Sequence, residues 1–325
     1  MTNRKVVTAS IAAAITIAGA VQAQDYPTQS IDVIVPTSAG GLTDLLVRTA
    51  AQHMSEELGQ PLVIENRPGA GTVVGITAAM KADPNGYTLV TPPASGFSIN
   101  PNLRDLEYDP VADFEGICLM GGAPSILVVN PELGITNFEE FLAKATADEL
   151  LFASAGPGTP SHLVQELLKI ELDKGGVETD FVHVPYKGTA QAVTDAIGGH
   201  AQVLFESPGP LIGGIKAGQL VPLGVSSPKR LAALPDVPTF AELGYPGVEL
   251  IGWVGMAAPK GTPKEIIDTL GAACLNATST PEYAKMAEDN GLQVFTAGPA
   301  EFDTWIADQI QHYGALVEAA GLEKE

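Results

Sequence analysis

A loop of small residues, Ser38-Ala39-Gly40-Gly41, has the composition of a backbone anion site. It follows the apolar run Ile31–Val35, which is typical of a buried strand, and a helical pattern begins after Thr43 and Asp44. The loop N–H groups and the dipole of the following helix then point to one place, which favours an anion. Asp44 can cap those N–H groups or accept a proton from a ligand. A plain tight turn would explain Asp44 but not the run of small residues.

A second loop of the same kind lies further along the chain, in SAGPGTPSHL (Ser154–Leu163). Gly158 frees the backbone, Thr159 and Ser161 add hydroxyl groups, and Pro160 suits the first turn of a following helix. One glycine loop is a weak signal, but two loops that each precede a helix can hold an anion from both sides. The two loops together predict an anion clamp.

Further candidates are polar residues beside strand ends and helix starts. Lys187, in Lys187-Gly188-Thr189, can pair with a ligand carboxylate, although a solvated loop lysine is the commoner case. Glu206 ends the strand pattern VLFE, where an acid either caps a loop or accepts from a ligand donor. Ala94 closes the stiff loop TPPA. Arg67 either clamps a carboxylate or fixes its own loop.

No pattern for covalent or acid–base catalysis accompanies these loops. His162 and His183 lack a partner at telling spacing, so we expect His162 to begin a helix and His183 to lie in a strand. The chain has no Gly-x-Ser-x-Gly, no His-x-x-x-His and no Gly-Lys-Ser/Thr motif, and its glycine spacing departs from the dinucleotide fingerprint. We therefore expect no catalytic residue, no metal and no cofactor.

The elements that must position these loops alternate between strand and helix. Strands are expected at 31–35, 61–65, 87–91, 151–154, 180–184, 201–206 and 221–226, and helices at 44–58, 72–82, 161–172 and 191–198. This rhythm predicts parallel strands joined by crossover helices, and such sheets bind ligands at the carboxyl ends of their strands. Two extended apolar segments, 114–129 and 248–259, are expected to cross between two α/β domains.

The N-terminus has the organisation of a secretory signal peptide. Arg4-Lys5 precede an uncharged apolar run, and Val21-Gln22-Ala23 fits a cleavage site, so we expect the mature chain to begin near residue 24 in the periplasm. The formal net charge of −21 argues against nucleic acid and anionic membrane surfaces as partners. The two cysteines, Cys118 and Cys274, either pair in an oxidising compartment or remain buried thiols.

Eight ordered blocks span nearly all of the expected mature chain. They are Tyr26–Asp44, Gly59–Gly71, Asp83–Leu89, Tyr108–Ile117, Gly158–Leu163, His183–Asp195, Leu234–Gly247 and Gly252–Pro263. Through these blocks the sequence resembles the periplasmic substrate-binding receptors of tripartite tricarboxylate transporters, the Bug-type receptors. Any one block alone would be a weak match, but eight in order are specific.

The resemblance implies an α/β fold of the type II-like periplasmic-binding-protein kind. Each domain would be a mainly parallel sheet flanked by helices, and two crossing strands would join them. Residues 24–122 with 253–325 would form one domain and 123–252 the other, after removal of residues 1–23. Such a receptor is expected to close as a monomer on a small di- or tricarboxylate and hand it to a membrane permease.

Carried over position by position, the resemblance also implies a set of ligand-binding residues. The expected set is Ser38, Ala39, Gly40, Gly41, Thr43, Asp44, Ala94, Ser154, Gly158, Thr159, Ser161, His162, Lys187, Gly188, Thr189 and Glu206. Three positions depart from the family pattern. Thr37-Ser38 stand where an aromatic residue and a proline are usual, and Glu206 stands where an aspartate is common. The residues that hold the ligand's carboxylate are therefore better determined than the identity of the group at the ligand's far end.

Two other functions use the same clamp. A sensory receptor would present the closed form to a signalling partner rather than to a permease. An extracytoplasmic enzyme would need a perturbed acid or base in the cleft, for which His162, Lys187 and Glu206 are the candidates.

Overall fold

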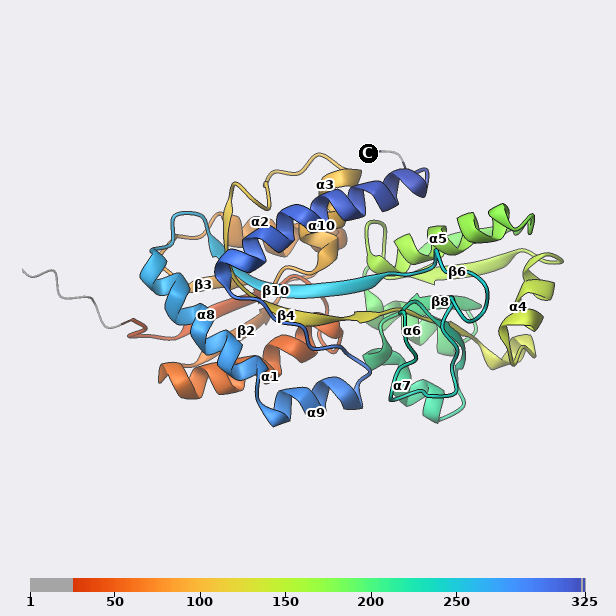
Figure 1. The fold of residues 1–325 in the computed structure, drawn as a ribbon, viewed down its shortest axis with the longest axis horizontal. Coiled ribbons are helices and arrows are strands. Elements are labelled where there is room, and N and C mark those ends of the chain that lie inside the picture. Colours follow the sequence, from red (N-terminus) through yellow and green to blue (C-terminus); the bar gives the residue numbers. More distant parts are fainter. Residues whose placement is uncertain (1–25, 323, 325) are drawn as a thin grey trace, which may run out of the picture.

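The structure of the chain is a computed structural model, which describes residues 26–322 and 324. The expected signal peptide lies outside the described residues. Two five-stranded sheets with helices on their faces make up the fold, in the strand orders β2-β1-β3-β10-β4 and β7-β6-β8-β5-β9. Figure 1 shows the two sheets beside each other, with β4 and β10 running between them. The expected α/β organisation is confirmed.

The strands are β1 (Ile31–Val35), β2 (Leu62–Asn66), β3 (Thr88–Val90), β4 (Phe114–Pro124), β5 (Ile126–Val129), β6 (Leu150–Ser154), β7 (Phe181–Pro185), β8 (Val203–Glu206), β9 (Val221–Val225) and β10 (Ile251–Pro259). The helices are α1 (Leu42–Leu58), α2 (Val73–Met80), α3 (Asn100–Leu103), α4 (Phe138–Ala145), α5 (Pro160–Lys174), α6 (Thr189–Ile197), α7 (Pro208–Lys216), α8 (Lys264–Thr278), α9 (Pro281–Asp289) and α10 (Pro299–Ala319). Short 3-10 turns, η1 (Ala70–Thr72) and η3 (Pro131–Leu133), and a π-helix, η2 (Ser95–Ile99), complete the set.

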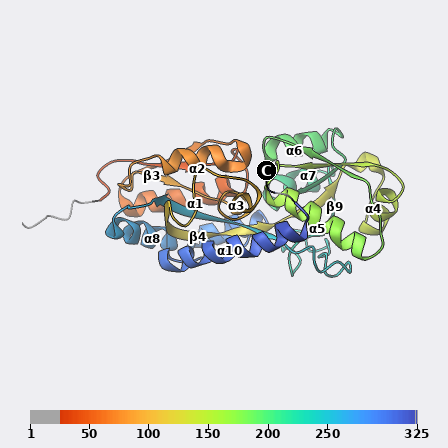
Figure 2. The ribbon, with the colours of Figure 1, turned by 90° about the horizontal axis from the view of Figure 1, so that it is seen from above.

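We call the first sheet with α1–α3 and α8–α10 the first lobe, and the second sheet with α4–α7 the second lobe. The two lobes lie end to end when the molecule is seen from above (Figure 2). None of the described helices is both long and apolar enough to cross a membrane.

Each sheet is mixed, with one reversed strand. In the first sheet β2, β1 and β3 pair in parallel, while β10 is antiparallel to both β3 and β4. In the second sheet β7, β6 and β8 pair in parallel, while β5 is antiparallel to both β8 and β9. Within each sheet, the four strands other than the reversed one therefore point the same way. The loops after β1, β6, β7 and β8 gather where the two sheets face each other.

Alternation along β1 explains why its sheet carries helices on both faces. Ile31, Val33 and Val35 belong to a buried cluster with residues of α1 and α8. Ile34 points the other way, into a second cluster that includes Ile76 of α2 and Phe302 of α10. Successive side chains of a strand point to opposite faces, so the apolar residues Val33, Ile34 and Val35 need cover on both sides of the sheet.

The crossing segment predicted at 114–129 is divided between the two sheets. β4 ends at Pro124 in the first sheet, and β5 begins at Ile126 in the second. Ser125 separates them, and its N–H donates to Ser226 Oγ (2.8 Å). β10 pairs with β4 from Ile251↔Pro124 to Pro259↔Phe114, so the two crossing segments run side by side.

A disulfide joins Cys118 of β4 to Cys274 of α8, with the two Cα atoms 6.4 Å apart. The bond ties the crossing strand to a helix of the first lobe. The sequence left open whether the two cysteines form a disulfide or remain buried thiols, and the structure has the disulfide.

Candidate functional site

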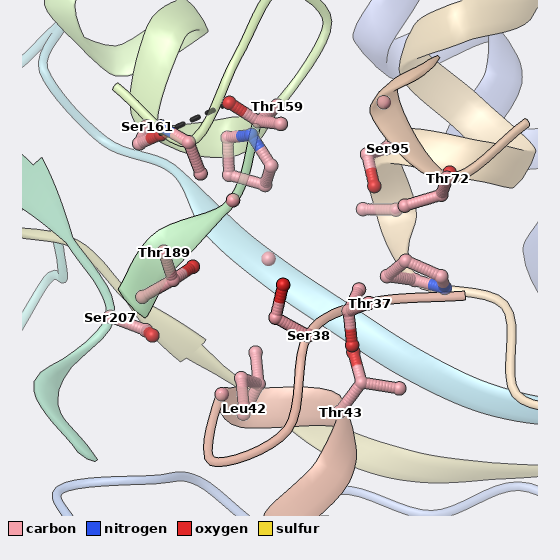
Figure 3. A pocket seen from close by; sticks show the side chains of 18 of the residues that line it. Thr37, Ser38, Leu42, Thr43, Thr72, Ser95, Thr159, Ser161, Thr189 and Ser207 are labelled. Atoms are coloured by element: carbon pink, nitrogen blue, oxygen red, sulfur yellow. Dashed lines mark hydrogen bonds between the residues drawn. The ribbon is translucent and has the colours of Figure 1, made fainter. Parts of the chain in front are cut away.

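A cavity of about 120 Å³ lies between the lobes, where loops from both sheets meet (Figure 3). The first lobe contributes Thr37, Ser38, Leu42 and Thr43, together with Thr72 and Ser95. The second lobe contributes Thr159, Ser161, Thr189 and Ser207. Hydroxyl groups from both lobes therefore surround the cavity, and prolines, Ala94, Ala123 and Trp253 supply its apolar wall.

Four helices begin at this cavity. Their N-cap residues are Gly41 of α1, Thr159 of α5, Gly188 of α6 and Ser207 of α7, and all four line the cavity. In none of these four does the N-cap side chain accept a hydrogen bond from the first turn. The first N–H groups of a helix need a partner, and the helix dipole favours a negative one. The convergence of four helix starts makes the cavity suited to an anion.

Asp44 shapes the loop at the start of α1 and is not among the cavity-lining residues. Gly40 N–H donates to its Oδ2 (2.9 Å), while Arg48 Nε and Asn66 Nδ2 both donate to its Oδ1 (2.9 Å each). Burial acts to raise the pKa of Asp44, but these hydrogen bonds outweigh burial and hold the pKa below its ordinary value. An ionised Asp44 therefore fixes Gly40, whose φ of +81° suits glycine.

Serine and threonine hydroxyl groups hold the second loop. Thr159 Oγ1 donates to Gly156 O (2.6 Å), and Ser161 Oγ accepts from Ala155 N–H (3.0 Å). The two hydroxyl oxygens are themselves 3.0 Å apart, the contact drawn as a dashed line in Figure 3. Ala155, Thr159 and Ser161 all line the cavity, so this internal network presents the start of α5 to it.

A stacked histidine pair supports the second loop from behind. The rings of His162 and His183 lie 4.2 Å apart between centroids and 13° from parallel. His183 Nε2 is hydrogen-bonded to Ser154 Oγ (2.6 Å), which in turn accepts from Gly156 N–H (3.1 Å). Burial, assisted by His183, lowers the pKa of His162 to about 4, and burial also lowers the pKa of His183. Both rings are therefore neutral at neutral pH.

Glu206 is the buried acid of the cavity, with 7% of its surface exposed. Its Oε1 accepts from Ser207 N–H (2.7 Å) and Ser207 Oγ (2.9 Å), and its Oε2 accepts from Thr189 Oγ1 (2.9 Å). Burial raises the pKa of Glu206, and the hydrogen bonds from Ser207 and Thr189 oppose that rise. Among the described residues that line the cavity, Lys187 and Glu206 are the only ionisable side chains.

The two lobes touch on both sides of the cavity. A Cβ on Gly188 would lie 2.7 Å from Ser38 Oγ. On the other side, a Cβ on Gly71 would lie 3.0 Å from Pro157 O, and one on Gly158 would overlap Asn100 Oδ1. The structure is therefore a closed form, in which glycines let the loops of the two lobes approach each other.

The structure brings most of the expected binding residues to the cavity. Those that line it are Ser38, Gly41, Thr43, Ala94, Thr159, Ser161, Lys187, Gly188, Thr189 and Glu206. Those that do not line it are Ala39, Gly40, Asp44, Ser154, Gly158 and His162. Asp44, Ser154 and His162 are instead hydrogen-bonded to, or packed behind, the loops that do.

Sequence reasoning missed several lining residues. Thr72, Ser95, Ser125, Ser207 and Trp253 all line the cavity. Trp253 is buried, and its Nε1 has no hydrogen-bond partner in the described part of the chain. Thr72 has a φ of +86°, unusual for a β-branched residue, and strained backbone of this kind gathers at functional sites. No local sequence signal marks these residues, since tertiary packing brings them together.

Comparisons with known proteins agree with this geometry. A family model described as "Tripartite tricarboxylate transporter family receptor" matches residues 46–322. Protein BugT of Bordetella pertussis is 34% identical over 312 residues, which is 94% of this chain and 93% of BugT. The solved structure of the periplasmic binding protein BugD superposes with a TM-score of 0.86 at 32% identity, covering 92% of this chain and 100% of BugD. R. palustris Rpa4515, solved with adipate, gives a TM-score of 0.88 at 27% identity, covering 93% of this chain and 100% of Rpa4515.

Proposed function

Because the chain belongs to the tripartite tricarboxylate transporter receptor family, we propose that it binds a small organic carboxylate between its lobes and delivers it to a membrane permease. The family is one of transport receptors, so the chain is a solute-binding protein and not an enzyme. The permease partner follows from the family's role in tripartite transport. BugD, a relative with the same fold, is a periplasmic binding protein, and this chain is proposed to work in the same compartment after cleavage near Ala23.

The observation that supports a carboxylate ligand is that four helices begin at one cavity and that none of them has a side-chain cap. A carboxylate placed there would accept hydrogen bonds from N–H groups at the starts of α1 and α5 and from the hydroxyl group of Ser38. The dipoles act within about one Debye length, roughly 8 Å, so the negative net charge of the chain does not prevent binding. Adipate, which Rpa4515 binds, is a carboxylate of this general class.

The proposed domains are residues 24–122 with 253–325, and residues 123–252. Contacts between Ser38 and Gly188 and between Gly71 and Pro157 hold the closed form, and they would separate when the cavity opens. Bending would be concentrated where β4 passes into β5 at Ser125, and where the chain enters β10. Ligand binding would then stabilise the closed form by filling the cavity between the lobes.

Fluorescence of the mature protein tests the proposal. The sequence has two tryptophans, so Trp305→Phe leaves Trp253 of the cavity wall as the sole reporter. Saturable changes on titration with a panel of organic carboxylates, confirmed by calorimetry, are expected at micromolar concentrations. The proposal fails if no organic anion in the panel binds saturably to protein that has been unfolded, dialysed and refolded to remove bound ligand.

A further inference from the structure

We infer that the cavity selects a small monocarboxylate that also carries a hydrogen-bond donor, a hydroxyl or ammonium group, and discriminates against dicarboxylates of the same length. This inference rests on the proposed function, because it identifies the ligand class of the same site. It is carried by Glu206, a buried acid in a cavity otherwise built to attract an anion.

Glu206 already occupies the donors at one side of the cavity. Ser207 N–H and Ser207 Oγ at the start of α7 donate to its Oε1, and Thr189 Oγ1 at the start of α6 donates to its Oε2. Figure 3 shows Thr189 and Ser207 together at this side, opposite Thr72 and Ser95. These donors would otherwise be free to bind a second ligand carboxylate. With Glu206 in place, this side presents an acceptor.

One acceptor position of Glu206 remains open. A carboxylate has about four lone-pair positions, and the three hydrogen bonds to Glu206 use two on Oε1 and one on Oε2. The three bonds also hold the side chain in one orientation. A ligand hydroxyl or ammonium group can donate to the remaining position on Oε2, and a carboxylate cannot donate unless it is protonated. Glu206 therefore favours a ligand that carries a hydrogen-bond donor.

The charges of the cavity point the same way. Among the described residues that line it, the only ionisable side chains are one basic residue, Lys187, and one acidic residue, Glu206. The starts of α1 and α5 can balance one ligand carboxylate through their dipoles. A second carboxylate would face Glu206 in a largely buried space, where like charges repel strongly.

The size of the cavity favours a compact ligand. Its volume of about 120 Å³ compares with the engineered cavity of about 150 Å³ that holds benzene. A benzene molecule has six carbon atoms, so the ligand would be a short-chain acid. A short carbon chain would suit the apolar wall of Ala94, Ala123 and Trp253 between the two polar ends.

Calorimetric titration with two matched series of acids tests the inference. The three-carbon series is propionate, β-hydroxypropionate, β-alanine and malonate, and the four-carbon series is butyrate, γ-hydroxybutyrate, γ-aminobutyrate and succinate. In at least one series the wild-type protein is expected to bind a donor-bearing acid about tenfold or more tightly than the plain acid and the diacid, because hydrogen bonds to charged groups are among the stronger ones.

Two variants separate the role of Glu206 from general effects. Glu206→Gln keeps the shape but removes the charge, and it is expected to lose the preference for the ammonium-bearing acid and to gain affinity for the diacid. Glu166→Gln makes the same change at a partly buried acid of α5 that does not line the cavity, and its preferences are expected to match the wild type.

The outcomes also distinguish this inference from the proposed function. Binding of the diacid at least as tightly as the donor-bearing acids, with no change of preference in Glu206→Gln, overturns the inference and leaves a carboxylate receptor. If no acid in either series, and none in the wider carboxylate panel, binds wild type or variant, the proposed function itself fails.

Discussion

Ser38 of the first lobe and Gly188 of the second lie so close that a Cβ on Gly188 would stand 2.7 Å from Ser38 Oγ. Gly188 has an extended backbone, with φ 163° and ψ 169°, so an alanine there would not be strained by its dihedral angles. Gly188→Ala is therefore expected to hinder closure and to weaken carboxylate binding by roughly three- to tenfold, the effect of about 1 kcal/mol. Calorimetry would measure the affinity and thermal unfolding the stability.

Gly213→Ala is the matched control, because a Cβ on that glycine of α7 meets nothing within 4 Å. In a Ser38→Ala protein, which lacks the hydroxyl that the new methyl group would meet, Gly188→Ala should cost less affinity than it does in the wild type. Equal affinity of wild type and Gly188→Ala would contradict a closing contact at this point.

Asp44 is expected to act on binding through the loop that it holds. In Asp44→Asn one of the three donors, Gly40 N–H, Arg48 Nε or Asn66 Nδ2, would face an amide N–H₂ group. We expect a loss of about 2 kcal/mol in the free energy of unfolding, the range for hydrogen bonds to charged groups. Affinity for the carboxylate should fall as well, by roughly tenfold.

The control for this variant is Asp268→Asn, at an exposed i,i+4 pair with Lys264 on α8. Exposed pairs of this kind contribute less than about 1 kcal/mol, so its stability and affinity should stay close to those of the wild type. Unchanged binding in Asp44→Asn would mean that the loop conformation does not depend on the carboxylate.

Thr72 and Ala70 both have positive φ angles, +86° and +46°, and they differ in their relation to the cavity. Thr72 lines it and Ala70 does not. Ala70→Gly should raise the free energy of unfolding by up to about 1 kcal/mol without changing affinity, because glycine relieves the backbone strain. Thr72→Gly should relieve similar strain and yet weaken ligand binding, measured by the same titration. A Thr72→Gly protein with wild-type affinity would remove Thr72 from the binding wall.

The histidine pair predicts a loss of stability in acid. His162 is neutral in the folded protein because burial, with His183, lowers its pKa from 6.5 to about 4. The unfolded chain binds more protons in that range, so stability is full above about pH 6.5 and falls as the pH drops toward 4. Replacing His162 by phenylalanine keeps an aromatic ring and should remove up to about 3 kcal/mol of this dependence.

The difference between wild type and His162→Phe isolates the histidine. Oε1 of Glu166 lies 3.9 Å from Nε2 of His162. Burial raises the pKa of Glu166 and the charge of Lys169 partly opposes that rise, so protonation of Glu166 favours the folded state as the pH falls. This contribution is present in both proteins and is removed by taking their difference. Parallel stability curves for wild type and His162→Phe between pH 7 and 4 would exclude the pair as its source.

The disulfide is expected to stabilise the fold without taking part in binding. Cys118 and Cys274 are separated by 156 residues, and closing so long a loop restricts the unfolded chain. The double variant Cys118→Ala/Cys274→Ala should lose about 2–5 kcal/mol in the free energy of unfolding. Carboxylate affinity at low temperature should be unchanged, and a large loss of affinity there would show that the bond shapes the cavity.

The order of strands and helices could be predicted because local patterns decide it. The apolar run Ile31–Val35 and the small-residue loop after it became β1 and the start of α1, as expected. The position of the division at Ser125 could not be predicted, since Gly121-Gly122 interrupt the apolar pattern of 114–129 as well as Pro124-Ser125 do. Which sheet each half joins depends on β10 and β8, which lie far away in the chain.

The site was predictable where loops precede helices and unpredictable where packing assembles it. The loops near Ser38 and Ser161 are recognisable by their composition, and both line the cavity. Asp44 is instead hydrogen-bonded to Gly40, Arg48 and Asn66, and the ring of His162 stacks on that of His183. Trp253 reaches the cavity from a strand of the crossing pair. Only the relative position of the two lobes reveals that role.

The strand order of the first sheet has a consequence for how the chain is made. β10 lies between β3 and β4, although it follows β4 by more than a hundred residues in the sequence. During synthesis from the N-terminus the second sheet, built from residues between β4 and β10, can be completed first. The first sheet must wait with a gap between β3 and β4 until β10 emerges. The first lobe is therefore expected to complete its fold after the second lobe, although the chain begins in the first.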